Sequence, residues 1–151
     1  MAFDAFGKLI RLPLFSRNQS PVRAWDVVAW WESRRIPYNL IVGAAGIASG
    51  VIILATAYVT EKIIGEAIGL PDPPFFAIIA VVLYGIMANV CFTGGWILEL
   101  LSRRMWGTRA EAFGEIAFTW GTFGSVLLTL LPAAVIVILG LYGVLTHRGH
   151  P

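Results

Sequence analysis

The sequence predicts an all-α integral membrane protein in which three helices cross the bilayer. Its composition is the first observation: 13% of the 151 residues are charged and 58% are hydrophobic, whereas a soluble domain carries about 25% charged residues. The second is that Asp, Glu, Lys and Arg are absent from 36–60, 73–98 and 116–147. Each stretch exceeds the roughly 20 residues that a helix needs to span the hydrocarbon core. Because hydrocarbon offers no hydrogen-bond partners, the backbone groups of such a stretch bond to one another, as they do in a helix.

The N-terminal quarter of the chain predicts a cytoplasmic arm of interfacial helices. Aromatic and aliphatic residues from Phe3 to Ile10 recur at helical spacing until Pro13 stops the pattern, which predicts a short amphipathic helix on the membrane or on a partner. Ser20, which a proline follows, then suits the N-cap of a second helix that reaches about Arg34.

This arm, residues 1–36, and the residues just after it carry side chains suited to the headgroup region. Indole rings favour the interface, and arginines reach lipid phosphates. Basic residues beside an anionic surface gain about 1 kcal/mol each, so anionic lipid is the expected partner of this face and nucleic acid is not. The predicted interfacial anchors are Trp25, Trp30, Trp31, Arg34, Arg35 and Tyr38.

Pro37 predicts a turn between the arm and a membrane domain over 37–146, because proline disfavours helix at the residue before it. The first span then covers about 39–60. Within it, Gly43, Gly46 and Gly50 form a small-residue surface, and such surfaces let transmembrane helices approach closely. We therefore predict that this face packs against another helix, of this chain or of a partner.

The second predicted span, about 75–101, contains Asn89 and Thr93. Asn89 is expected near the centre of the span, where an amide needs a hydrogen-bond partner. Two alternatives follow: a bond to a neighbouring helix, or the polar lining of a pore or binding pocket.

Glu99 is expected at the cytoplasmic end of the second span, four residues before Arg103. This order favours an exposed helical ion pair. The alternative is a proton or ion site, because carboxylates inside a membrane usually mark a function.

The region from 108 to 146 is longer than one perpendicular span. We expect an interfacial segment over about 108–122 and a third span over about 123–145, which Pro132 is expected to kink. Residues 147–151 form a tail with His147 and His150. Two histidines rarely hold a metal without a third ligand, so no metal site is predicted.

The basic residues predict the orientation. Nine lie in the arm or between the second and third spans, against two, Lys62 and Arg148, in the first loop and the tail. Such an excess marks the cytoplasmic side, so the N-terminus is expected in the cytoplasm and the C-terminus outside. The nine are Lys8, Arg11, Arg17, Arg23, Arg34, Arg35, Arg103, Arg104 and Arg109.

No catalytic constellation is recognisable in the sequence. It contains no GxSxG, phosphate loop, HExxH, CxxC or dinucleotide fingerprint, so no catalytic residue, cofactor or enzymatic activity is predicted. Cys91 is the single cysteine and lies inside the second span, so it forms no intrachain disulfide.

The segment 30–39 reads Trp-Trp-Glu-Ser-Arg-Arg-Ile-Pro-Tyr-Asn. It resembles a pattern in small, uncharacterised bacterial multi-pass membrane proteins, in which a tryptophan- and arginine-rich segment precedes Tyr-Asn and an apolar, glycine-containing helix. The resemblance covers under a tenth of the chain and implies no activity. With the charge distribution, it favours the bacterial inner membrane as the location.

Three functions remain compatible with these features. The preferred hypothesis is a non-enzymatic membrane protein that assembles with itself or joins a larger complex as a small subunit. The second is a homo-oligomeric channel or transport component with a polar path along the second span. The third is a protein that binds or modifies lipid headgroups through its interfacial carboxylates and arginines.

Overall fold

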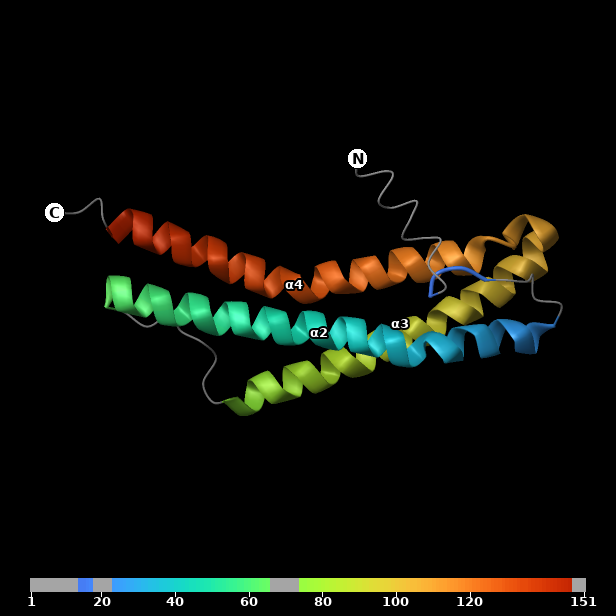
Figure 1. Ribbon diagram of the computed structural model, residues 1–151, viewed down its shortest axis with the longest axis horizontal. Helices are drawn as coiled ribbons and strands as arrows, with labels where there is room; N and C mark the ends of the chain where they lie inside the picture. Colours follow the sequence, from blue (N-terminus) through green and yellow to red (C-terminus); the bar gives the residue numbers. More distant parts are fainter. Residues whose placement is uncertain (1–13, 18–22, 66–73, 148–151) are drawn as a thin grey trace. The chain divides into compact units, whose positions relative to one another are not determined.

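The computed structural model describes residues 14–17, 23–65 and 74–147. Across these ranges the regular structure is entirely helical, which confirms the predicted all-α class. The helices are α2 (Ala24–Ile64), α3 (Pro74–Trp106), a short 3₁₀ helix η1 (Gly107–Ala110) and α4 (Phe113–His147), as Figure 1 shows. Three of them, α2, α3 and α4, are long and apolar enough to cross a membrane.

Local chemistry explains where the helices begin and end. At the start of α2, the Asp26 carboxylate accepts a hydrogen bond from the Arg23 backbone N–H at 2.9 Å. Asp26 is the third residue of the helix, and its side chain caps the backbone N–H of the residue just before the helix. Gly65 and Gly107 follow α2 and α3 with φ of 79° and 58°. Glycine adopts this left-handed conformation without steric cost, and it ends a helix.

The predicted turn at Pro37 is wrong, because α2 passes through this residue as one helix of 41 residues. Proline removes one backbone hydrogen bond from a helix, but side chains on both sides of it are held by α3. Trp31 and Arg35 before the proline and Tyr38 after it all contact α3. These contacts hold α2 against α3 on both sides of the proline.

The interfacial segment expected over about 108–122 stays a prediction, and the structure shows the helices of this region. The chain passes from η1 into α4, which runs without a break from Phe113 through Pro132 to His147. Of the arm, the expected helix ending at Pro13 and the N-cap at Ser20 lie outside the described residues. The second arm helix is the beginning of α2 rather than an element of its own.

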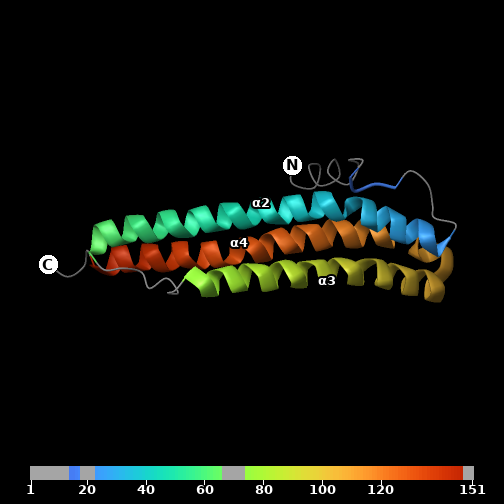
Figure 2. The same cartoon turned by 90° about the horizontal axis from the view of Figure 1, so that it is seen from below.

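Residue contacts divide the chain into two compact units, and all three long helices contribute to both. The first, here the Glu99 unit, comprises Met1–Leu40 and Ile86–Gly124. The second, the Tyr84 unit, comprises Ile41–Gly85 and Ser125–Pro151. Within the Glu99 unit, the first turns of α2, the last turns of α3 and the first turns of α4 lie side by side in both Figure 1 and Figure 2.

The Tyr84 unit is packed through small and hydroxyl-bearing side chains. A Cβ built on Gly46 of α2 would lie 3.8 Å from the Thr129 methyl group of α4, which is ordinary van der Waals contact. The Tyr84 hydroxyl donates to the Ser125 carbonyl at 3.1 Å and also bonds to the Thr129 hydroxyl. The described buried residues of this unit are Val42, Ser49, Ala57, Thr60, Ala133 and Gly140.

Candidate functional site

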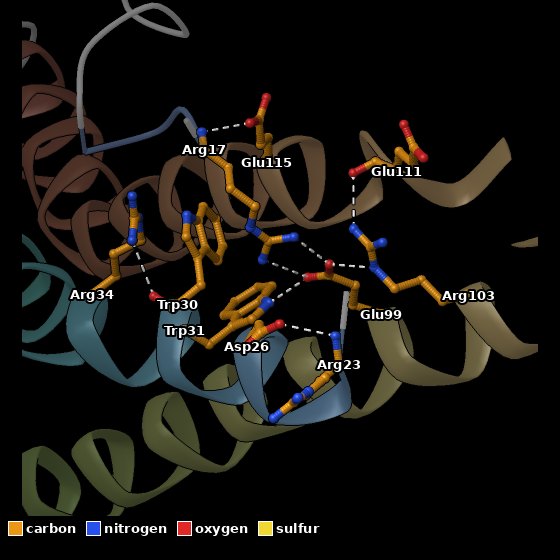
Figure 3. A network of polar contacts seen from close by, with 10 residues as sticks. All are labelled: Arg17, Arg23, Asp26, Trp30, Trp31, Arg34, Glu99, Arg103, Glu111 and Glu115. Carbon is orange, nitrogen blue, oxygen red and sulfur yellow. Dashed lines mark hydrogen bonds and ion pairs between the residues drawn. The ribbon is translucent and has the colours of Figure 1, made fainter. Parts of the chain in front are cut away.

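The centre of the Glu99 unit is a buried carboxylate. Glu99, on α3, is 0% exposed. Its Oε1 accepts from Arg17 Nη1 at 2.7 Å and from Arg103 Nε at 2.8 Å, and its Oε2 accepts from Trp31 Nε1 at 2.7 Å (Figure 3). A buried charge is tolerated only when it is paired and hydrogen-bonded. Here two guanidinium groups and an indole N–H meet that requirement.

Two glycines make this arrangement possible. A Cβ on Gly114 of α4 would lie 2.7 Å from the Glu99 carboxyl carbon, and a Cβ on Gly95 of α3 would lie 2.5 Å from the Trp31 ring. Real Cβ atoms essentially never come this close to another heavy atom. Glu99 and Trp31 therefore occupy space that any larger residue at these two positions would fill.

Aromatic rings surround the carboxylate. Phe118 of α4, which is 1% exposed, contacts Trp30 and Trp31 edge-on, with ring centroids 5.8 Å and 5.7 Å away. Phe92 of α3 packs against Trp31 at 5.3 Å and against Tyr38 at 4.9 Å. Edge-on pairs at these distances are favourable, so the cluster joins α2, α3 and α4.

Residues 14–17, here the N-terminal segment, lie against this cluster. Arg17 reaches Glu99 with its side chain, and its backbone N–H donates to the Glu115 carboxylate at 2.6 Å. Arg34 donates to the backbone carbonyls of Leu14 at 2.7 Å and Ser16 at 2.9 Å.

Phe15 and Trp30 complete these contacts. Phe15 is 6% exposed, and its ring packs against Phe118 at 5.6 Å. The Trp30 ring lies 4.3 Å from the guanidinium carbon of Arg17 and 4.0 Å from that of Arg34. Cations near an indole face are attracted by its quadrupole, so Trp30 helps to hold both arginines.

A second polar cluster joins α2 to α3 within the same unit. Arg35 donates to both carboxylate oxygens of Glu32, at 2.8 Å and 2.6 Å. It also donates to Asn89 at 3.3 Å and to Thr93 at 3.2 Å. The amides of Asn39 and Asn89 bond to each other reciprocally, at 3.3 Å and 3.1 Å.

The structure alters how the predicted polar residues of the second span are interpreted. Glu99 does pair with Arg103, but the pair is not exposed as expected, because three helices and the N-terminal segment enclose the carboxylate. Asn89 bonds to α2 beside Arg35 and Asn39. It therefore lies beside the residues at the start of the first predicted span.

The six predicted interfacial anchors have different surroundings. Trp25 is 77% exposed, whereas Trp31 and Tyr38 are 2% and 3% exposed and belong to the aromatic cluster. Trp30, Arg34 and Arg35 hold other parts of the same unit. Sequence reasoning treated a tryptophan and its neighbour alike, although consecutive helical residues point in directions about 100° apart.

The glycines of the first span are also unequal. Gly46 faces Thr129, whereas a Cβ on Gly43 or Gly50 would meet nothing within 4 Å. Sequence reasoning missed Arg17, Phe118, Gly95 and Gly114. The sequence marks Arg17 only as one of several basic residues, and it carries no signal that pairs Gly114 with Glu99.

The cluster binds the Arg17 guanidinium group and backbone groups of residues 14–17. In the described part of the chain, no three His, Cys, Asp or Glu side chains lie together in a way that could hold a metal ion. Comparisons with known protein families, with curated proteins and with solved structures found nothing that matches this chain.

Proposed function

We propose that this protein is a non-enzymatic membrane protein that acts through assembly, with itself or as a small subunit of a larger membrane complex. One observation carries the proposal: Gly43, Gly50, Gly94 and Gly124 lie inside the helices, yet a Cβ at any of them would meet nothing within 4 Å in the described part of the chain. A glycine inside a helix costs about 1 kcal/mol relative to alanine. Packing within the chain does not account for that cost at these four positions.

Close approach by another helix would account for it. Lipid chains are as apolar as leucine, so transmembrane helices associate through van der Waals contact and interhelical hydrogen bonds, and small residues permit that contact. Gly43 and Gly50 are seven residues apart, about two helical turns, and so share one face of α2. We propose this face as a contact surface for another helix.

The same proposal includes the location and orientation. Nine basic residues lie in the stretches proposed to be cytoplasmic, against two in those proposed to lie outside, in keeping with the excess of basic residues in cytoplasmic loops. We place the protein in a bacterial inner membrane with its N-terminus in the cytoplasm. Fusing a cytoplasm-active reporter to one end of the chain and then to the other tests this; activity at the C-terminus alone would contradict it.

The assembly proposal is tested by filling the glycine face. We expect Gly43→Ile together with Gly50→Ile to leave the helix content unchanged, because a Cβ at either position meets nothing within 4 Å in the described part of the chain, and to abolish assembly. Native mass spectrometry after mild detergent extraction reports the bound partners and separates copies of this chain from other subunits.

Ala48→Ile serves as the matched control, because Ala48 is exposed on a different face of α2. We expect this variant to assemble as the natural protein does. A natural protein that is strictly monomeric, with nothing bound after extraction, would contradict the proposal.

A further inference from the structure

We propose that the surface holding the N-terminal segment is a docking site for a partner protein, one that presents a segment with an aromatic residue and, two positions later, an arginine. This docking surface consists of Trp30, Arg34, Glu99, Glu115 and Phe118. In the structure the chain's own residues 14–17 occupy it.

The docking surface is built by the helices and not by its occupant. Trp30 and Arg34 come from α2, Glu99 from α3, and Glu115 and Phe118 from α4. Phe118 also packs against Trp31 and Phe92, and Glu99 is also bound by Trp31 and Arg103. These contacts of Phe118 and Glu99 do not involve residues 14–17.

Three of the contacts are made to backbone groups, which any segment of the same shape possesses. Arg34 donates to the carbonyls of Leu14 and Ser16, and Glu115 accepts from the Arg17 backbone N–H. Main-chain hydrogen bonds of this kind supply affinity in peptide recognition, whereas side-chain pockets supply specificity. A foreign segment of the same shape can therefore make all three.

Two side chains supply the specificity. The Phe15 ring packs on Phe118, and the Arg17 guanidinium lies between Glu99 and the Trp30 ring. A guanidinium offers a planar set of donors that a carboxylate accepts in parallel, and here the distances to the two oxygens of Glu99 are 2.7 Å and 3.4 Å. The acidic groups of the surface thus complement a cationic occupant.

The resident segment is suited to being exchanged. Arg17 Nε is buried and has no hydrogen-bond partner among the described residues, and a buried donor without an acceptor disfavours the docked state. When Arg17 leaves, Glu99 keeps Arg103 and Trp31 as partners. The vacated surface therefore does not leave an unpaired buried charge, which would otherwise oppose release.

This inference goes beyond assembly through the glycine face of α2 and does not depend on it. The two rest on different residues, and their tests are independent. Filling Gly43 and Gly50 leaves every residue of the docking surface in place, and the variants below leave the glycine face unchanged.

The test measures binding of a fluorescent peptide with the sequence of residues 12–19, Leu-Pro-Leu-Phe-Ser-Arg-Asn-Gln, to the full-length protein in detergent. Arg17→Ala and Phe15→Ala each weaken the resident segment without altering the docking surface. We expect both variants to bind the peptide at least about tenfold more tightly than the natural protein does, because a site freed of a competitor gains apparent affinity.

Two controls make the result specific. A peptide with alanine in place of its arginine should bind no variant above the background of micelle partitioning. Adding Glu99→Gln to Arg17→Ala should abolish peptide binding, with circular dichroism to confirm that the helices remain. Equal binding of the peptide to the natural protein and to both single variants, or equal binding of the alanine peptide, would overturn the proposal.

Discussion

The Glu99 unit and the Tyr84 unit are built from the same three helices, yet different kinds of side chain make the contacts between the helices in each unit. The Glu99 unit encloses a carboxylate, guanidinium groups and large aromatic rings. The Tyr84 unit has small or hydroxyl-bearing residues at its contacts, and the described ranges show no ion pair within it. Helix formation alone therefore does not explain how either unit is held together.

The difference shows two ways in which helices can be held against one another. Between helices in lipid there is no hydrophobic driving force, so close contact and a few hydrogen bonds supply the attraction. The Tyr84 unit follows that pattern. In the Glu99 unit, charged groups act on one another where little water intervenes, so each pairing is strong and each loss is costly.

The largest expected effect is the loss of the buried charge. Glu99→Gln leaves Arg17 and Arg103 without their carboxylate, and removing one partner of a buried ion pair typically costs about 3–5 kcal/mol. The free energy of unfolding in an SDS titration measures this change. Glu32→Gln is the matched control, because its pair with Arg35 is partly exposed and such pairs contribute about 0–1 kcal/mol.

Equal losses of unfolding free energy for these two variants would contradict the proposed difference between a buried and an exposed ion pair. Proteolysis provides a second measurement of the same difference. Trypsin cleaves after arginine, and Arg17 has only 8% of its side chain exposed. We expect Glu99→Gln to speed cleavage after Arg17 and to leave cleavage after the exposed Arg23 unchanged.

The next effect concerns two adjacent glycines of α3. Gly95→Ala places a Cβ 2.5 Å from the Trp31 ring, whereas Gly94→Ala places one in open space. Overpacking costs about 1–3 kcal/mol, and alanine in a helix gains up to about 1 kcal/mol over glycine. We expect the first change to lower the free energy of unfolding and the second to raise it slightly in the unassembled protein; the same sign for both would contradict the packing described.

The smallest effect is expected in the Tyr84 unit. Tyr84→Phe removes the hydroxyl that bonds to Ser125 and Thr129, and interhelical hydrogen bonds in membranes average about 0.6 kcal/mol. Tyr142→Phe, at a tyrosine that is 67% exposed, should change the free energy of unfolding even less. A loss above about 2 kcal/mol for Tyr84→Phe would exceed the largest such bonds and show that this unit also depends on its polar contacts.

Sequence reasoning reached the helices more easily than the contacts between them. The charge-free stretches predict three apolar helices because the hydrocarbon thickness sets a minimum length, and three helices of that kind are present. The turn expected at Pro37 fails because a propensity acts locally, whereas Arg35 and Tyr38 are held by α3. These tertiary contacts override the local preference of the residue before a proline for a non-helical backbone.

In the candidate site, too, a contact within one helix can be predicted from the sequence, whereas contacts between helices cannot. Glu99 and Arg103 are four apart on one helix, so their pairing is visible in the sequence. Arg17 and Trp31 lie 82 and 68 positions from Glu99 along the chain. No periodicity relates residues so far apart, and only the packing of α2, α3 and α4 brings their side chains to one carboxylate.

By itself, then, the sequence determined the class of protein and the number of apolar helices, because composition and helix length are properties of single segments. The tertiary structure decided that Glu99 is enclosed, that Trp31 and Tyr38 face inward, and that the Trp31 ring fills the space beside Gly95 but not that beside Gly94. The reason is geometric. Which atoms surround a side chain depends on the rotation of each helix about its axis, and a single sequence fixes that rotation only where polarity differs strongly between faces.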